Sequence, residues 1–520
     1  MSPNEDYTAV RDAAIATSLA NLCYLKVWCG CLAPGGYESY LAKLPASPVR
    51  IAAVFLNVLF LATLFWAGAQ WVRSGRRARI TALARLGFVA ALIIPLNAVR
   101  MLVKSDGWLG RLSLYFRPDT PGGMLRLCIL TIGGCCAFVL LAKPISRAAS
   151  VALLILWPFV LVTFGSGIVQ MFRYNPAPYR DLGPAARIVS SGGAPRIVWM
   201  IFDEMDQRLA FDKRERNLQL PEFDRFRAQA LYAENALPPA GETLESIPSL
   251  TIGRVVERGL PRGPTELDLL PDADGKPLDW RAQPTVFTEA RRLGFNAAVV
   301  GWYHPYCRLF GASLTDCWWS ELMTSDGSTE SSAGTFLMNQ ARSLVETATW
   351  SPWDTTVTTE TQIRLYSAVL ERAKRAAVDP GLGLVLLHLP APHGPFLYDR
   401  TTGRFSLRNS PIRGYWDNLA LADRTLGELR SAMERAGTWD RTTVLISADH
   451  SFRESQRLDG RSDPRVPFLL HLAGQNDATV FHTTFNTVVT HDLLLAILRR
   501  EIRTTTDAAS WIGGHASPAR

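Results

Sequence analysis

The sequence lacks the features of a disordered, repetitive or nucleic-acid-binding chain. It has no internal repeat and no low-complexity tract, and its 520 residues are 20% charged and 48% hydrophobic, which excludes wholesale disorder. Positive charge is missing where a soluble nucleic-acid-binding domain would need it. Residues 1–172 hold 16 lysines and arginines against 6 acidic residues, whereas residues 173–520 hold 39 against 41. We therefore expect no nucleic-acid partner.

Long apolar runs are concentrated in the first third of the chain. About 20 apolar residues suffice to cross a bilayer. Four runs clearly reach this length, and a fifth, less apolar stretch, Ala13–Leu32, contains Lys26. The pattern predicts a transmembrane helical domain of about five spans over residues 1–172. A buried helical core is the alternative, but short basic loops between such runs disfavour it. The four clear runs are Ile51–Val72, Ile80–Val103, Leu127–Ala142 with its flanks, and Ser150–Phe172.

The charges of the connecting loops predict the orientation of these spans. Four arginines lie within residues 73–79, and Lys143 and Arg147 lie between the last two predicted spans. Because basic loops stay in the cytoplasm, the C-terminal part is expected outside. The chain starts with an acidic, polar segment and shows no small-residue cleavage pattern, so we expect Ala13–Leu32 to be a signal anchor. These features predict a multi-pass protein of the bacterial inner (plasma) membrane, with its C-terminal domain on the periplasmic or extracellular side.

Cysteine is scarce outside the apolar region. Six of the eight cysteines lie in or beside the predicted spans, and only Cys307 and Cys317 lie beyond them. These two are ten positions apart and flank a loop that contains Gly311. A disulfide between them fits an oxidising periplasm, and two free thiols are the alternative.

The remainder of the chain alternates between strand-like and helical patterns. Such alternation predicts a mainly parallel sheet covered by helices on both faces. We expect a linker over residues 173–195, an α/β domain over 196–505 and a C-terminal tail over 506–520. The pattern is complete without the spans, so the part from about residue 190 onward is expected to fold alone. The predicted strands are Arg196–Phe202, Asn296–Val300, Leu382–Leu389, Thr442–Ser447 and Val466–Leu472, and the longer helices are Glu360–Ala377 and Tyr415–Arg435.

Carboxylates and imidazoles follow three of the predicted strands. Asp203 comes directly after the first strand, Asp449 and His450 follow the strand ending at Ser447, and His393 follows the strand ending at Leu389. Ligands of parallel sheets bind beyond the carboxyl ends of the strands, and these side chains are metal ligands. A single aspartate there is more often a turn or N-cap residue, but the set together predicts a metal site.

Thr243 stands where a helix can begin, in the segment TLESIPSLTIGR over residues 243–254. The backbone N–H groups and the positive dipole end of a helix stabilise a phosphoryl or sulfuryl group attached to such a hydroxyl. A bound dication would lower the pKa of the hydroxyl and make it a nucleophile. The alternative is that Thr243 only caps the helix.

The order and context of six segments resemble the alkaline phosphatase superfamily. The resemblance is to its sulfatase-like, membrane-anchored branch, which includes phosphoethanolamine transferases and lipoteichoic acid synthases. It covers about residues 195–500 and implies an alkaline-phosphatase/sulfatase-like parallel-sheet domain. The segments are IFDEMD (201–206), TLESIPSLTIGR (243–254), HLPAPHGPF (388–396), YWDNLALADRTLGEL (415–429), ISADHSF (446–452) and VPFLLHLAG (466–474).

The resemblance implies roles for particular residues. Thr243 is expected to be the nucleophile, because the formylglycine pattern of classical sulfatases would begin at Ser246 but lacks its arginine here. His393 is expected to contact the transferred group. His304, which otherwise only packs beside Cys307, and Arg465 are further candidates for substrate binding. The implied ligands of one divalent metal, zinc first and manganese next, are Asp203, Thr243, Asp449 and His450.

The activity that follows is a transfer reaction at a membrane. The resemblance implies a metal-dependent transferase that moves a phospho-substituent, phosphoethanolamine- or phosphoglycerol-like, from a lipid headgroup donor to an envelope glycan or lipid acceptor. Its intermediate is a phosphorylated Thr243. A membrane-tethered sulfatase or phosphatase is the first alternative, and a non-catalytic relative is the second.

Overall fold

The computed structural model describes residues 3–32, 35–74, 78–103, 121–189, 193–271, 275–321, 332–348, 356–406 and 412–515. The chain divides into two compact units. The helical unit comprises residues 1–34, 44–175 and 324–353, and the sheet unit comprises residues 35–43, 176–323 and 354–520. Two segments therefore depart from the continuous boundaries that the sequence predicts.

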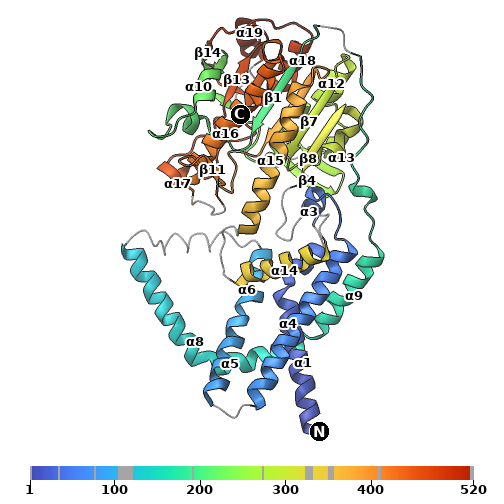
Figure 1. The fold of residues 1–520 in the computed structure, drawn as a ribbon, viewed down its shortest axis with the longest axis vertical. Helices are drawn as coiled ribbons and strands as arrows, with labels where there is room; N and C mark the ends of the chain where they lie inside the picture. Colours follow the sequence, from blue (N-terminus) through green and yellow to red (C-terminus); the bar gives the residue numbers. More distant parts are fainter. Residues whose placement is uncertain are drawn as a thin grey trace. The chain divides into compact units, whose positions relative to one another are not determined.

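The helical unit is built from apolar helices (Figure 1). Three helical stretches in the described part of the chain are long and apolar enough to cross a membrane: Pro48–Ser74, Arg79–Leu102 and Phe138–Ile155. Tyr7–Cys23 and Leu25–Leu32 are long and apolar enough only as a pair, which is bent by 64° and adds a fourth stretch if the pair is one span. The helices are α1 (Pro3–Cys23), α2 (Leu25–Leu32), α4 (Pro48–Ser74), α5 (Ala78–Ala91), α6 (Ile93–Val103), α8 (Pro121–Ile155), α9 (Pro158–Phe172) and α14 (Ala333–Ala348).

The last two predicted spans do not end where the sequence suggests. The predicted loop around Lys143 and Arg147 lies inside α8, which continues to Ile155. Lys143 and Arg147 are four residues apart and exposed, so a helix carries both charges on one side and needs no loop to expose them. One of the two loops that predicted the orientation is therefore absent.

Polar side chains join α14 to the helices before it in the helical unit. The Asn57 amide on α4 donates to the Gln340 side chain at 3.0 Å and to the Leu337 carbonyl at 3.2 Å. Asn97 on α6 donates to the Thr347 carbonyl at 2.8 Å. These bonds satisfy polar groups buried among apolar residues.

The sheet unit contains an eight-stranded sheet of order β14-β2-β13-β12-β1-β9-β7-β8. β13 is antiparallel to both its neighbours, and the other pairings are parallel, so the predicted mainly parallel α/β fold is confirmed in this mixed form. The strands are β1 (Ile197–Phe202), β2 (Leu231–Ala233), β7 (Ala297–Trp302), β8 (Asp316–Ser320), β9 (Leu384–Leu389), β12 (Thr443–Ser447), β13 (Phe468–His471) and β14 (Thr479–Phe481).

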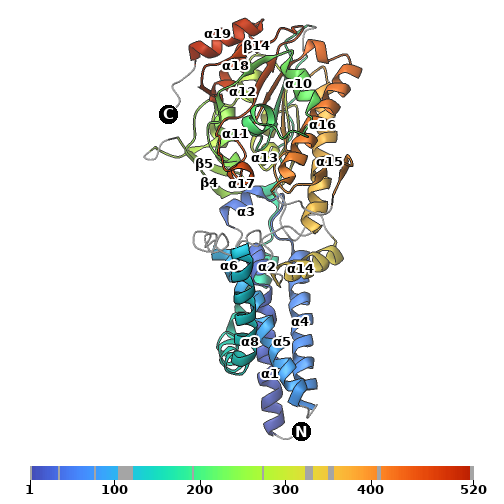
Figure 2. The ribbon, with the colours of Figure 1, turned by 90° about the vertical axis from the view of Figure 1, so that its left-hand side faces the viewer.

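Helices cover both faces of this sheet, with α15 and α16 on one side and α12 and α18 on the other (Figures 1 and 2). The central strands β1, β9 and β12 are buried along their whole length, which explains their continuous apolar sequences. The helices are α3 (Gly36–Leu41), α10 (Pro221–Arg227), α11 (Thr243–Ile252), α12 (Val286–Arg292), α13 (Tyr306–Phe310), α15 (Thr356–Val378), α16 (Gly414–Arg435), α17 (Gln456–Asp459), α18 (Thr490–Leu498) and α19 (Thr505–His515).

Short strands, the predicted linker and the predicted C-terminal tail complete the sheet unit. The predicted linker lies along the unit: the Leu182 N–H bonds the Cys307 carbonyl at 3.1 Å, and the Ala185 N–H bonds the Leu314 carbonyl at 2.8 Å. The predicted C-terminal tail instead contains α19, whose Ala508 is buried because small and apolar residues recur on its inner side. The short strands are β3 (Ala236–Leu237), β4 (Arg258–Gly263), β5 (Glu266–Leu270), β6 (Leu278–Asp279), β10 (Tyr398–Asp399), β11 (Arg404–Phe405) and β15 (Phe485–Asn486).

Candidate active site

Two neighbouring strands bring the first candidate ligands together. β1 pairs with β12 so that Ile201 lies opposite Ser447, and the chain leaves both strands at the same edge of the sheet. Asp203 follows β1 directly, and Asp449 follows β12 after one residue. Both carboxylates are fully buried. The parallel pairing thus places two acidic groups side by side in the interior.

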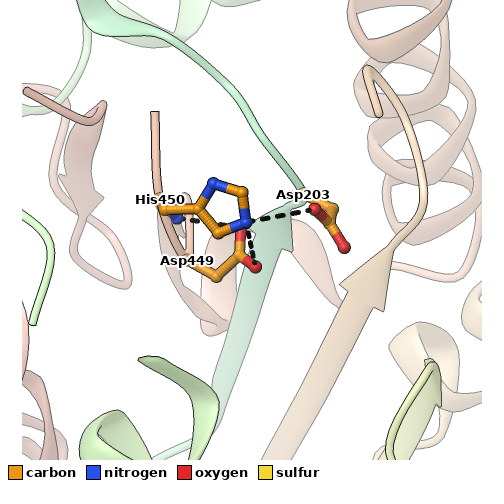
Figure 3. Close-up of side chains that lie close together, drawn as sticks. All are labelled: Asp203, Asp449 and His450. Atoms are coloured by element: carbon orange, nitrogen blue, oxygen red, sulfur yellow. Dashed lines mark hydrogen bonds and ion pairs between the residues drawn. The ribbon is translucent and has the colours of Figure 1, made fainter. Parts of the chain in front are cut away.

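Asp203, Asp449 and His450 form a buried cluster whose ligand atoms all lie within 4.8 Å of one another (Figure 3). The His450 Nε2 atom is 3.5 Å from Asp449 Oδ2 and 4.0 Å from Asp203 Oδ1. The His450 Nδ1 atom is 3.0 Å from the carbonyl of Ser451. A carbonyl can only accept, so Nδ1 donates its proton there and Nε2 faces the carboxylates.

Thr243 lies beside this cluster as the first residue of α11, and Glu242 occupies the N-cap position. The Thr243 hydroxyl donates to Asp449 Oδ2 at 2.7 Å and lies 3.3 Å from His450 Nε2. The side chain therefore bonds the acidic cluster rather than capping the helix backbone. Ser246, the alternative nucleophile, is buried with its hydroxyl on the Ala240 carbonyl at 2.9 Å.

His393 lies at the opening of the site. Its backbone N–H bonds the Asp203 carbonyl at 3.1 Å, and its side chain is 26% exposed. The Nδ1 atom bonds the Gly394 carbonyl at 2.5 Å, and Nε2 is 3.9 Å from Glu204. Burial opposes the charged imidazole, but the carboxylates of Glu204 and Asp203 outweigh it and raise the pKa of His393. A partly exposed imidazole beside the cluster fits contact with a substrate.

His304 and Arg465 are not placed as substrate-binding groups. His304 is fully buried, burial lowers its pKa to about 3, and its Nε2 lies 3.1 Å from the Thr243 backbone carbonyl. The Arg465 guanidinium bonds the carboxylates of Asp463 and Asp212 at 2.7 and 2.9 Å. Since these ion pairs and the Glu234 carbonyl take up its donors, the structure gives no support to substrate binding by Arg465.

A sequence model of the sulfatase family matches residues 195–499. The chain belongs to the sulfatase family. The match covers more than half of the 520 residues and confirms the resemblance to the alkaline phosphatase superfamily. A comparison with curated protein sequences finds no match.

Solved structures of the same superfamily are similar to this sulfatase-family chain at low identity. The PsFucS1 sulfatase from Pseudoalteromonas sp. is 13% identical over 59% of this chain and 68% of its own, with a TM-score of 0.42. An alkaline phosphatase superfamily protein from Vibrio parahaemolyticus is 13% identical over 60% and 68%, with a TM-score of 0.38. The phosphonate monoester hydrolase of Agrobacterium radiobacter is 12% identical over 59% and 74%, with a TM-score of 0.36.

The acidic cluster of this sulfatase-family chain fits a divalent metal ion. Neither carboxylate oxygen of Asp203 has a hydrogen-bond partner within the described part of the chain, although both are buried. Burial, reinforced by the neighbouring Asp449, raises the pKa of Asp203, whereas the pKa of Asp449 is lowered because His450, His388 and the Thr243 hydroxyl outweigh its burial. Two buried carboxylates and one imidazole nitrogen are donors that a dication accepts.

His388, Tyr306 and Arg453 lie beside the site but carry no recognisable signal in the sequence. His388 lies within β9 and reads as a core residue, but its Nε2 is 3.4 Å from Asp203 Oδ2 and its Nδ1 is 2.8 Å from the Tyr306 hydroxyl. Glu204 adopts a positive φ of 62° and bonds Arg453 at 2.8 Å. In the pairing of β9 with β1, His388 lies opposite Ile201, and Asp203 follows Ile201 two positions later. Only this pairing shows that His388 faces Asp203.

Cys307 and Cys317, the two cysteines predicted to pair, are joined by a disulfide with a Cα–Cα distance of 5.6 Å. The bond links α13 to β8. Cys23 and Cys31 of the helical unit are buried.

Proposed function

We propose that the chain is a membrane-anchored, metal-dependent transferase that uses Thr243 as its nucleophile. The observation that carries the proposal is the Thr243 hydroxyl at the start of α11, 2.7 Å from Asp449 and 3.3 Å from His450. Membership of the sulfatase family supports reaction at a phosphate or sulfate ester. The transferred group of the proposal is a phospho-substituent from a lipid headgroup, and the acceptor is an envelope glycan or lipid.

The residues of the site supply each step of such a transfer. The Thr243 oxygen attacks phosphorus and passes its proton to Asp449 Oδ2, while the bond from phosphorus to the leaving alcohol breaks. His393 Nε2 gives that alcohol its proton, and the backbone N–H groups at the start of α11 face the phosphoryl oxygens. The acceptor hydroxyl then loses its proton to His393, attacks phosphorus, and releases Thr243, which recovers its proton from Asp449.

Asp203, Asp449 and His450, with the Thr243 hydroxyl, would hold a divalent cation, and zinc is our first choice before manganese. When bound, the cation supplies a Lewis acid that lowers the pKa of the Thr243 hydroxyl. Asp203 has two buried, unpartnered oxygens available for it. Donors of mixed oxygen and nitrogen type suit zinc.

The membrane location is part of the proposal. Three helical stretches long and apolar enough to cross a membrane support anchoring beside a lipid donor, which raises its local concentration. The Cys307–Cys317 disulfide supports an oxidising compartment, so we place the sheet unit in the periplasm of a bacterial inner membrane. In the test, intact cells are alkylated and the protein is then denatured without reductant. Cys307 and Cys317 should both remain unlabelled. Labelling of both would contradict this location.

Intact-mass spectrometry of the protein incubated with its own membranes tests the reaction. A phosphorylated intermediate should appear as an added mass on the whole chain, and its value identifies the transferred group. Peptide mapping should then locate this mass on the peptide that contains Thr243. Thr243→Ala should carry no added mass. A sulfate adduct, or release of free phosphate or sulfate without an acceptor product, would favour the hydrolase. The absence of any adduct or product with every lipid fraction would favour a non-catalytic relative.

A further inference from the structure

A short segment from between two apolar helices is built into the sheet unit. Residues 35–43 follow α2 and precede α4 in sequence, but they pack within the sheet unit. Their helix α3 lies against β4 so closely that a Cβ atom at Gly36 would meet the Pro261 carbonyl oxygen at 2.2 Å. Only glycine fits at this approach without a shift of the backbone.

A buried arginine holds this segment in place. Arg308 is fully buried, and its guanidinium donates to the carbonyls of Tyr40 at 3.2 Å, Ala42 at 2.5 Å and Pro264 at 3.0 Å. It also lies 5.2 Å from the ring centroid of Trp319. A buried charge is costly unless its donors are satisfied, and two of these three carbonyls belong to residues 35–43. The segment is therefore a fixed part of the sheet unit.

A chain of hydrogen bonds leads from this segment to Thr243. The Tyr40 hydroxyl lies 2.9 Å from His304 Nδ1, and His304 Nε2 lies 3.1 Å from the Thr243 backbone carbonyl. Tyr40 and His304 are both fully buried. The carbonyl can only accept, so Nε2 carries the proton, and Nδ1 of the neutral ring accepts from the Tyr40 hydroxyl. Tyr40 thereby selects the tautomer that His304 needs to bond Thr243.

We propose that Tyr40 and His304 are positioning residues for Thr243, so that residues 35–43 complete the active site. The inference rests on the proposed role of Thr243 as nucleophile. Neither residue touches the Thr243 hydroxyl. They hold the backbone carbonyl of Thr243, and with it the first turn of α11, so that the hydroxyl meets Asp449 and His450. A nucleophile misplaced by about 1 Å can lose about 100-fold in rate.

A second path connects the same segment to α11. β4, against which Gly36 packs, bonds α11 through the Gly259 N–H and Glu245 Oε1 at 2.9 Å. The expectation that residues from about 190 onward form a complete domain therefore needs correction. Such a fragment would lack the partner of His304 and most acceptors of Arg308.

The contacts of His304 favour a positioning role for this residue over proton transfer. Both of its ring nitrogens face partners inside the fold, Tyr40 and Thr243, and its ring packs edge-to-face on Trp280 at 4.9 Å. A ring so enclosed has no nitrogen directed at a leaving group. His304 thus differs from His393, whose side chain is partly exposed.

The first test removes one hydroxyl from the full chain in detergent. With bis(p-nitrophenyl) phosphate as the probe, Tyr40→Phe should lower kcat about tenfold and leave KM within about twofold. Tyr232→Phe is the matched control, because it removes another buried hydroxyl, which lies on β2 and accepts a hydrogen bond from the Gln207 side chain instead of one in the His304 chain. It should keep the wild-type kcat. Equal kcat values for wild type, Tyr40→Phe and Tyr232→Phe would overturn the inference.

The second test compares two replacements of His304. The Nε2 atom of glutamine can take the place of the imidazole Nε2 and donate to the Thr243 carbonyl, whereas alanine cannot. His304→Gln should therefore keep kcat within about threefold of wild type, and His304→Ala should lower it by about tenfold or more. If both variants fold and bind metal but His304→Gln is as inactive as His304→Ala, the positioning role is contradicted and proton transfer by His304 is favoured instead.

Hydrogen exchange gives a measurement that does not depend on activity. The amides at the start of α11 should exchange faster in Tyr40→Phe than in wild type or Tyr232→Phe, and unchanged exchange would contradict the inference. Thr243→Ala separates a failure of the proposed nucleophile from a failure of the positioning role. If Thr243→Ala is inactive and Tyr40→Phe is fully active, only the positioning role is contradicted. If Thr243→Ala is active, both the role of Thr243 as nucleophile and the positioning role are contradicted.

Discussion

The two units of this protein use buried polar side chains for different purposes. In the helical unit, Asn21 accepts hydrogen bonds from Trp28 at 2.8 Å and Thr163 at 3.0 Å, and Asn57 and Asn97 bond α14. In the sheet unit, both oxygens of Asp203 are buried and have no hydrogen-bond partner within the described residues, although His388 Nε2 lies 3.4 Å from Oδ2. Hydrogen bonds between polar side chains connect helices, whereas a buried acidic group without a hydrogen bond indicates a place for a ligand.

The surfaces of the two units differ as well. Large apolar side chains are exposed along the helical unit, among them Phe60 at 65% and Leu140 at 77%. The sheet unit exposes ion pairs instead, such as that between Arg214 and Asp224 at 2.7 Å. The contrast is what a lipid-facing part and a water-facing part require. It leads to predictions in which substitutions at the site of the sheet unit change chemistry, whereas a substitution in the helical unit changes only stability.

The largest expected effect is the loss of the nucleophile. Thr243→Ala should lower kcat by three orders of magnitude or more, because removal of a nucleophile leaves only binding and electrostatic stabilisation. Turnover of bis(p-nitrophenyl) phosphate by the purified full chain measures it. Ser246→Ala is the control, since its hydroxyl bonds the Ala240 carbonyl away from the cluster. Full activity of Thr243→Ala together with inactivity of Ser246→Ala would transfer the nucleophile to Ser246.

The next effect concerns the metal. His450→Ala should lower bound metal and activity together, because it removes one of three donors clustered within 4.8 Å. Thr243→Ala should keep much of the metal, since Asp203, Asp449 and His450 remain. Elemental analysis of wild type and both variants decides between them. A wild-type protein without stoichiometric metal, and with activity that chelators leave unchanged, would refute the site.

Two arginines of the sheet unit should respond differently. Arg453 bonds Glu204 at 2.8 Å and also pairs with Glu242, the residue before Thr243. Arg453→Ala should therefore lower kcat/KM about tenfold. Arg465 is engaged by Asp212 and Asp463, so Arg465→Ala should cost about 1 kcal/mol of stability and leave KM unchanged. If KM rises in Arg465→Ala but not in Arg453→Ala, the result would support the predicted contact between Arg465 and the substrate.

The smallest effect is expected in the helical unit. Asn57→Ala removes two hydrogen bonds to α14 and should cost about 1 kcal/mol of stability, near the average for such bonds between apolar helices. Thermal unfolding in detergent measures the loss, and kcat on the soluble probe should match that of wild type. A tenfold fall in kcat without a change in melting temperature would break the contrast between the two units.

Local patterns were enough for much of the site. Asp203, Asp449 and His450 follow buried apolar strands, and such strands end at one sheet edge in any parallel arrangement, so their meeting was predictable. Thr243 was recognisable as a helix start. For Arg465 the sequence shows an arginine near the site but not the carboxylates of Asp212 and Asp463 that bind it, so its role as a substrate contact stays a prediction. Lys143 and Arg147 suggested a loop, since spacing alone does not show that a helix can expose both.

The sequence by itself determined the apolar helices, the α/β pattern and the metal-binding residue types, because each depends on periodicity or on residues directly after a strand. Only the tertiary structure decided which side chains support them. His388 faces Asp203 through the pairing of β9 with β1. Tyr40 reaches His304 across 264 positions. Contacts of this kind depend on how distant segments pack, and no local pattern in the chain records that packing.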